Sequence, residues 1–175
     1  MKYIIPIIIF SLVLLSCAKK DEEKDTTTEL EGTWKTACYT DDDNNSLIFT
    51  PTFAGNVLTI TDEKHSDTSC ATDYRMKEET HTFAMGDAGK LTITLGSNYQ
   101  RTPQSSSVVT TYNSESKCDH SDWELNTAKT CSEEGAGDTI YCLYGLSGTT
   151  VYIKCDGNEH PTSIPITAEN TFTKQ

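Results

Sequence analysis

The sequence predicts an all-β domain, either a barrel or a sandwich of about eight short antiparallel strands. Three observations predict a strand-rich fold, its disulfides and its organisation as one domain. Short segments rich in β-branched and aromatic residues follow one another, with turn residues between them. Six cysteines, an even number, follow an N-terminal segment that is typical of exported proteins. Residues 31–175 have the length of one domain with a single core.

The N-terminal segment predicts export followed by lipid attachment. Residues 4–15 form a run of twelve mostly apolar residues. A helix of that length covers about 18 Å, against roughly 30 Å of bilayer hydrocarbon, so the run is typical of a signal peptide. It ends in Leu-Leu-Ser-Cys at 14–17, which resembles the lipobox of bacterial lipoproteins. The resemblance implies cleavage after Ser16, diacylglycerol on the sulfur of Cys17 and acylation of the new amine.

These features divide the chain into a signal peptide (1–16), a lipidated cysteine with a flexible tether (17–30) and a β domain (31–175). Residues 18–28 hold mixed charges, a threonine run and one small apolar residue, so they bury too little surface to offset the entropy of ordering. Two or three acyl chains anchor a protein stably. We therefore expect a membrane-anchored protein of the cell envelope. Ala18 favours the outer membrane, and the sequence leaves the side of that membrane open.

The charge balance excludes one class of partner. The chain has 26 acidic and 14 basic residues. Nucleic-acid binding depends on clustered Lys and Arg that displace counterions from phosphates. The sequence therefore predicts no nucleic-acid partner.

The predicted strands follow the β-favouring segments in chain order. Alternation is clearest in two of them, where it places Leu58 and Ile60, and then Leu91, Ile93 and Leu95, on a buried face. Turn residues at 41–45, 86–89 and 135–138 separate strands. Residues 121–129 are the one stretch that suggests a helical turn. The predicted strands are 34–39, 47–49, 56–61, 72–84, 90–95, 108–112, 139–144 and 150–155.

The cysteines of the domain predict up to three disulfides. Six cysteines allow fifteen pairings, and none has the Cys-x-x-Cys spacing of zinc or redox sites. The last two predicted strands form a hairpin signal, and if Leu146 faces Val151, Cys142 lies opposite Cys155 at disulfide distance. Cys38 with Cys70 and Cys118 with Cys131 complete the set with the least entanglement.

The start of the domain carries a family resemblance. Leu30-Glu31-Gly32-Thr33-Trp34 resembles the Leu-x-Gly-x-Trp signature at the first strand of lipocalins and lipocalin-like bacterial lipoproteins. The resemblance implies an up-and-down barrel of eight strands in which Trp34 packs across the closed end. It also implies a basic residue over the tryptophan, which the sequence does not identify. The Thr-Asp-Tyr block of lipocalins is not evident, so the chain resembles an outlying member.

Catalytic and metal-binding patterns are weak, so we expect no enzyme, no metal and no cofactor beyond the lipid on Cys17. The four histidines have no shared spacing, and we expect them to be solvated. His120 has acidic neighbours but no nucleophile motif accompanies it. Residues 41–45 resemble the start of a calcium loop, but Ser46 and Thr52 stand where such a loop needs Gly and Glu.

Two functional hypotheses remain open. In the first, the barrel binds a small apolar or amphiphilic ligand, and Leu58, Ile60, Ile93, Tyr141 and Ile153 line the pocket. In the second, side chains fill the barrel, and its acidic, threonine-rich outer face or loops bind another protein at the cell surface. An eight-stranded barrel accommodates either arrangement.

Overall fold

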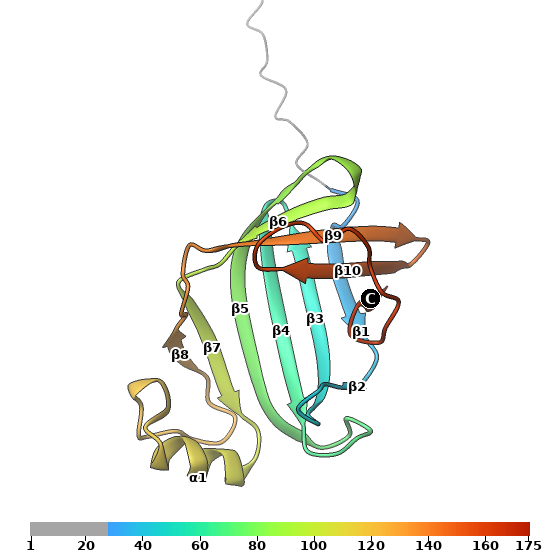
Figure 1. Cartoon of the computed structure of the whole chain (residues 1–175). Coiled ribbons are helices and arrows are strands. Elements are labelled where there is room, and N and C mark those ends of the chain that lie inside the picture. The colour runs from blue at the N-terminus through green and yellow to red at the C-terminus, as the bar shows by residue number, and fades with distance from the viewer. Residues whose placement is uncertain (1–27) are drawn as a thin grey trace, which may run out of the picture.

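A computed structural model describes residues 28–175 and shows a closed antiparallel barrel (Figure 1). Each of its eight strands pairs with the next along the chain, and the last pairs with the first. Closure confirms the barrel and excludes the sandwich. The barrel strands are β1 (Gly32–Thr36), β3 (Ser46–Ala54), β4 (Val57–His65), β5 (Asp73–Met85), β6 (Lys90–Thr94), β9 (Thr139–Ser147), β10 (Thr150–Asp156) and β11 (Thr171–Lys174).

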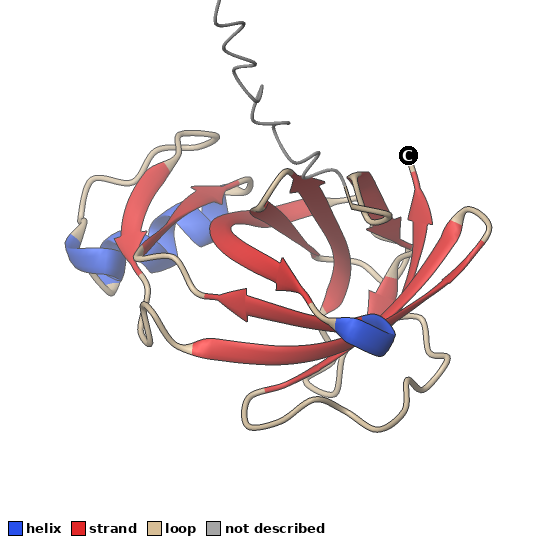
Figure 2. Cartoon of the chain, turned by 90° about the horizontal axis from the view of Figure 1, so that it is seen from above, coloured by secondary structure: helices blue, strands red, loops and turns tan. Residues whose placement is uncertain are grey.

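Three further strands extend the sheet beyond the closed ring. The short strand β2 (Tyr39–Thr40) pairs with the start of β3. The long strand β5 has two partners: its second half pairs with β6, and its first half pairs with β7 (Asn98–Pro103), which in turn pairs with β8 (Lys129–Ser132). Figures 1 and 2 show β7, β8 and the helix between them beside the barrel.

The helix between β7 and β8 corrects the strand predicted at 108–112. Residues Ser106–Ser114 form α1, although the segment is rich in valine and threonine. The side chain of Ser105 caps the helix by accepting a hydrogen bond from the Val108 N–H. Val108 and Tyr112, four residues apart, are the buried residues of the helix. Tertiary packing therefore overrides the β preference of these residues.

The helical turn predicted at 121–129 is also wrong. Residues 121–128 form no helix, and β8 begins at Lys129. The backbone N–H of Trp123 instead donates to the side chain of Asn113 at 2.6 Å, and the indole N–H donates to the carbonyl of Lys117 at 3.1 Å. These hydrogen bonds give both N–H groups of Trp123 an acceptor without the backbone hydrogen bonds of a helix. Short 3-10 turns occur at Asp87–Gly89 and Lys117–Asp119.

All three predicted disulfides are confirmed. The register of β9 and β10 sets Leu146 opposite Val151 and Cys142 opposite Cys155, with a Cα–Cα distance of 3.9 Å. A close Cα approach is typical of a non-hydrogen-bonded antiparallel pair, which is where a cross-strand disulfide fits. The Cys38–Cys70 and Cys118–Cys131 bonds have Cα–Cα distances of 5.9 Å and 5.1 Å.

The interior is divided into two hydrophobic clusters. The smaller one joins α1 to β7 and β8 and is built on Val108, Tyr112, Trp123 and Cys131. The larger one fills the barrel and consists of Leu30, Trp34, Phe53, Leu58, Phe83, Leu91, Ile93, Cys142, Tyr144, Val151 and Phe172.

The folded part begins earlier than the sequence suggests. Residue 30 was expected to end the flexible tether, but the Leu30 side chain is 0% exposed and belongs to the barrel core. The hydroxyl of Tyr144 donates a hydrogen bond to the carboxylate of Glu29. Glu29 and Leu30 are therefore part of the fold.

Candidate functional site

The indole of Trp34 lies deep within the barrel interior and is held on two sides. Its side chain is 1% exposed, and its N–H donates to the carbonyl of Leu30 at 2.7 Å. The ammonium of Lys174, on the last strand, lies 5.2 Å from the centre of the indole ring. Because Trp34 and Lys174 are directly paired across β1 and β11, barrel closure itself brings these two side chains together.

A cavity of about 100 Å³ lies inside the barrel and has a wholly apolar lining. Four of the five predicted lining residues contribute to it: Leu58, Ile60, Ile93 and Ile153. They come from β4, β6 and β10, so the closed sheet is what brings them around one space. The other lining residues are Phe49, Pro51, Phe53, Leu91, Cys155 and Phe172.

The fifth predicted lining residue, Tyr141, does not line the cavity. Side chains alternate between the two faces of a strand, and Cys142 points into the core. Its neighbour Tyr141 must therefore point outward, and there its ring packs edge-on against His160 with 5.1 Å between ring centres. The register that places Cys142 opposite Cys155 already implies this orientation.

Two of the histidines are buried rather than solvated, which corrects the sequence-based expectation. His81, opposite Leu58 on the inner face of β5, is 4% exposed, and its Nδ1 accepts the N–H of Gly96 at 3.1 Å. Burial lowers its pKa. His65 is 7% exposed, and its Nδ1 lies 3.4 Å from a carboxylate oxygen of Asp73.

Charged side chains continue the inner face beyond the cavity. Along β4, the inward positions after Leu58 and Ile60 are Asp62 and Lys64. We call the charged residues of this face the inner ionic patch. Its members on β4, β5 and β7 are Asp62, Lys64, Arg75, Lys77, Glu79 and Arg101.

Most charges of the inner ionic patch are neutralised within it. The guanidinium of Arg75 donates to Asp62 at 2.9 Å. The ammonium of Lys77 lies 2.5 Å from Glu79 and 3.5 Å from Glu133. These side chains are only 13% to 19% exposed, so the pairs are partly shielded from water.

Arg101 differs from Arg75 and Lys77, the two cations of the patch that form ion pairs. Among residues 28–175 its guanidinium forms no ion pair, and its Nε is buried without a hydrogen-bond partner. Its Nη1 donates to the hydroxyl of Tyr112 at 3.1 Å. Its guanidinium carbon lies 5.3 Å from the ring centre of Tyr99 and 5.7 Å from that of Tyr112. Sequence reasoning missed this residue because Tyr112 and its helix were assigned to a strand.

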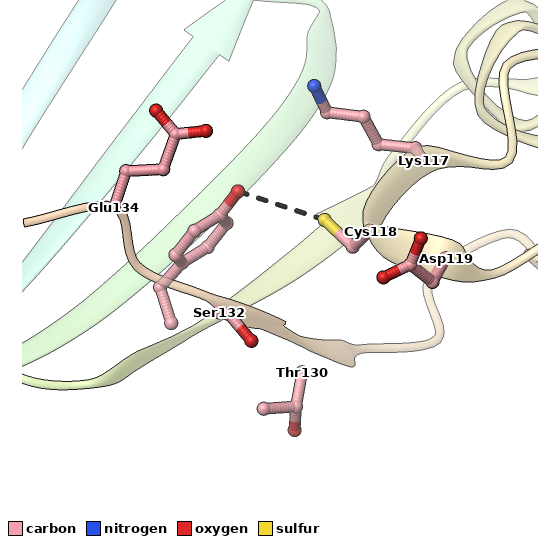
Figure 3. Close-up of a pocket in the computed structure, with 7 residues that line it drawn as sticks. Lys117, Cys118, Asp119, Thr130, Ser132 and Glu134 are labelled. Atoms are coloured by element: carbon pink, nitrogen blue, oxygen red, sulfur yellow. Dashed lines mark hydrogen bonds between the residues drawn. The ribbon is translucent and has the colours of Figure 1, made fainter. Parts of the chain in front are cut away.

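Two further pockets are open to the surface, and the first of them is mainly polar. The first, of about 270 Å³, lies beside the Cys118–Cys131 disulfide, where the Tyr99 hydroxyl is 3.7 Å from the sulfur of Cys118 (Figure 3). The second, of about 340 Å³, lies in the loop before β11. There Nδ1 of His160 is 2.9 Å from the carbonyl of Cys142. Neither pocket places a nucleophile against a base.

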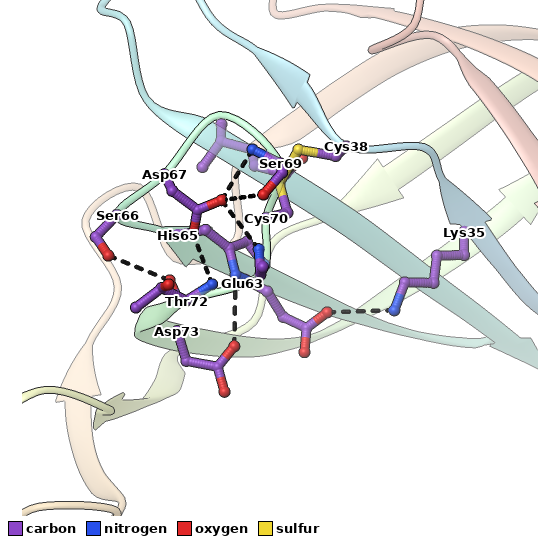
Figure 4. Close-up of polar contacts among 12 residues, drawn as sticks. Lys35, Cys38, Glu63, His65, Ser66, Asp67, Ser69, Cys70, Thr72 and Asp73 are labelled. Atoms are coloured by element: carbon purple, nitrogen blue, oxygen red, sulfur yellow. Dashed lines mark hydrogen bonds and ion pairs between the residues drawn. A yellow bond between two sulfur atoms is a disulfide. The ribbon is translucent and has the colours of Figure 1, made fainter.

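The loop 66–72 is held together by hydrogen bonds to the side chain of Asp67. The carboxylate of Asp67 accepts hydrogen bonds from the backbone N–H groups of Ser69, Ala71 and Thr72 and from the Ser69 hydroxyl (Figure 4). These bonds, led by the one from the Ser69 hydroxyl, lower the pKa of Asp67. Its oxygens are already occupied, so the loop is a structural element, and Cys38–Cys70 ties it to the connection between β1 and β2.

Metal ligands are not assembled in the part of the chain that the structure describes. No group of three or more His, Cys, Asp or Glu side chains converges there. The acidic turn at 41–45 instead folds on itself, with Asp41 accepting the backbone N–H of Asn45 at 2.7 Å. Within residues 28–175, no helix combines the length and the apolar character needed to cross a bilayer.

Comparison with known proteins gives no relative from which to transfer a function. No family model matches the chain, and no curated protein matches it in sequence. Cys17 and the signal peptide predicted at 1–16 lie outside the described residues. The candidate site is therefore defined by geometry alone: an apolar cavity inside the barrel, continued by the inner ionic patch.

Proposed function

We propose that this protein is a membrane-anchored lipoprotein whose lipocalin-like barrel binds the apolar part of a small amphiphilic molecule. One observation carries the proposal, namely the cavity with a purely apolar lining inside a closed barrel. An apolar cavity of about 150 Å³ in another protein stays dry and binds benzene, so a space of this chemistry favours an apolar guest over water.

The size of the cavity limits what enters it. At about 100 Å³ it is smaller than the benzene site and well below the roughly 300 Å³ of the smallest typical ligand pockets. A short alkyl group fits, whereas the remainder of a larger ligand must lie elsewhere. The inner face next to the cavity is ionic, beginning at Asp62 beyond Ile60. An amphiphile therefore suits the site better than a wholly apolar molecule.

The arrangement around Trp34 supports the lipocalin-like part of the proposal. The resemblance of 30–34 to the lipocalin signature implies a tryptophan inside the barrel and a basic residue over it. Trp34 is buried, and the ammonium of Lys174 lies 5.2 Å from its ring centre. The basic residue that the sequence left unassigned is thus available in Lys174.

Anchoring rests on the lipobox-like segment and on the disulfides. Three disulfides in one domain are typical of exported proteins, because the cytosol keeps thiols reduced. Replacing Cys17 with Ala in the full-length protein tests the anchor. We expect unprocessed precursor or release of the domain from the membrane fraction, while the control Lys20→Ala stays processed and anchored. Unchanged membrane association of Cys17→Ala would refute lipidation.

Ligand binding is tested by what remains bound to the purified protein. We expect mass spectrometry to find one amphiphile per barrel in the chain from Ala18 onward, which contains every described element. Ile153→Phe places extra volume in the cavity and should abolish the ligand. Leu143→Phe adds the same volume on the outward face of β9 and should retain it. Repeated absence of any ligand from the unmodified protein contradicts the proposal.

A specific observation favours a second candidate, an interaction module with a filled barrel. On the outer face, Thr59 is paired with Thr52 on one side and Thr80 on the other. Thr33 extends this row onto β1, where its hydroxyl lies 3.0 Å from that of Thr52. A continuous row of hydroxyl groups across four strands presents a regular polar surface to a protein partner. The second candidate would be favoured if the purified protein carries no ligand and if a protein partner that binds the unmodified protein no longer binds the Thr59→Lys variant.

A further inference from the structure

We infer that the barrel selects amphiphiles with a single carboxylate head group and that Arg101 binds this group. The inference rests on the proposed function and deepens it, because it specifies the chemical class of the ligand. Its basis is the side-chain arrangement of the inner ionic patch and of α1, which covers one end of it. Neither the lipobox nor the resemblance at 30–34 contributes to it.

The distribution of charge points to an anionic ligand. The chain as a whole has a formal net charge of −12, yet its only two arginines, Arg75 and Arg101, both face inward on neighbouring strands. Lys77 lies two residues after Arg75 on β5 and is directly opposite Arg101 on β7. Cations are therefore concentrated on the inner face of an acidic protein, which attracts an anion to this face.

Among the described residues, ion pairing within the patch leaves two of its cations without a carboxylate partner, Lys64 and Arg101, and Arg101 is the one that carries a guanidinium. Arg75 is taken by Asp62, and Lys77 is taken by Glu79 and Glu133. Within residues 28–175, Arg101 has no carboxylate partner, and one of its N–H groups is buried without an acceptor. A guanidinium carries five N–H donors in a planar fork that matches a carboxylate. One free fork suits one carboxylate.

The surroundings of Arg101 hold the guanidinium in place before a ligand arrives. The Tyr112 hydroxyl accepts a hydrogen bond from it at 3.1 Å, and the rings of Tyr99 and Tyr112 lie within 6 Å of its carbon atom. The ammonium of Lys77 lies 4.2 Å from the centre of the same Tyr99 ring, which adds positive potential for an anion at this point. A guanidinium fixed in this way loses little entropy on binding.

Sheet register places Arg101 within reach of the cavity. Ile60, which lines the cavity, is opposite Glu79, and Glu79 is opposite Tyr99. Arg101 is two residues further along β7. Two strand spacings of ~4.8 Å and two residues of ~3.4 Å separate the α-carbons of Ile60 and Arg101 by about 12 Å. A medium-chain carboxylate therefore has the length to place its alkyl end in the cavity and its head at Arg101.

Calorimetric titration with three probes of equal chain length tests the inference: octanoate, octanamide and octylamine. The protein is the chain from Ala18 onward, free of detergent. We expect octanoate to bind at least about tenfold more tightly than octanamide, because hydrogen bonds to a charged group are stronger than neutral ones. We expect octylamine to bind more weakly than octanamide. Rising salt concentration should lower the affinity for octanoate and leave the affinity for octanamide unchanged.

Substitutions at Arg101 identify the binding group. Arg101→Gln should lower the affinity for octanoate by about tenfold or more and leave the affinity for octanamide unaffected. The control Lys154→Gln removes a cation from the outer face of β10 and should change neither probe. Arg101→Lys keeps the charge but loses the fork, so it should retain a smaller preference for octanoate. Near-UV circular dichroism verifies that each variant keeps its tertiary packing, and Arg101→Lys serves as the test if Arg101→Gln does not fold.

The outcomes separate this inference from the proposed function. Equal affinity for octanoate and octanamide, or an Arg101→Gln protein that binds octanoate as the unmodified protein does, overturns the carboxylate site and leaves apolar binding intact. If none of the three probes binds, the proposed function fails, and this inference fails with it.

Discussion

Truncation of Leu30 tests where the folded domain begins. Its side chain is 0% exposed and packs in the barrel core, and its carbonyl accepts the indole N–H of Trp34. Removing a fully buried leucine side chain in a well-packed core costs about 2.7 to 5 kcal/mol. Because Leu30→Ala leaves the carbonyl in place, this estimate concerns packing alone. Total domain stability is about 5 to 15 kcal/mol, so the variant should lose a large share of it.

Urea unfolding, followed by tryptophan fluorescence, measures this cost. Leu30→Ala should lower the midpoint strongly at an unchanged dependence of stability on urea. The matched control is Leu125→Ala, because Leu125 is 48% exposed and its truncation should change stability by less than about 0.5 kcal/mol. If Leu30→Ala lowers the free energy of unfolding by less than about 1 kcal/mol, Leu30 belongs to the tether and not to the core.

Three further predictions concern the β9–β10 disulfide, the buried side chain of His81 and the close backbone contact at Gly96. Replacing Cys142 and Cys155 together with Ala should cost about 3 kcal/mol in urea unfolding, the chain-entropy value for a loop with a sequence separation of 13; an unchanged midpoint would contradict it. Burial lowers the pKa of His81, so the unfolded chain binds a proton that the folded chain excludes. The contribution of His81 to the free energy of unfolding should therefore be present above pH 6.5 and be lost as the pH falls below it. Between pH 7.5 and 5.5 the stability of His81→Asn should fall less steeply than that of the unmodified protein; equal slopes of stability against pH would show that another group is responsible. A Cβ on Gly96 would lie 2.0 Å from the carbonyl oxygen of Thr80, so Gly96→Ala should destabilise by about 1 to 3 kcal/mol. Gly157→Ala, with open space around it, should not.

The hairpin of β9 and β10 shows how far local pattern predicts structure. Two β-rich segments and a short Gly-containing connection fix the register, and the register fixes which residues are opposite. Cys142 and Cys155 were therefore paired correctly from sequence alone. The same register requires Tyr141 to point away from the cavity, which was not taken into account when Tyr141 was assigned to the lining.

The insertion between β6 and β9 shows where local pattern fails. Val108–Tyr112 has strong β preference, but the segment folds as a helix because Ser105 caps it and its apolar residues four apart pack into the second cluster. Neither contact is visible in the β preference of individual residues. The same contacts bring Tyr112 to Arg101, so the feature that defines our carboxylate site depended on an element that sequence reasoning misassigned.

The sequence by itself determined the strand-rich class, the Cys142–Cys155 pair and four of the cavity residues, because alternation and register are local properties of the chain. The other two disulfide pairs were expected only as the least entangled completion of the set. Only the tertiary structure decided the closure of the sheet, the burial of Leu30 and the volume of the cavity. It also decided that Arg101 lies beside Tyr112 without an ion pair among the described residues. Each depends on distances between segments that are far apart in sequence. Such distances follow from how the whole sheet curves and packs, and no local pattern specifies them.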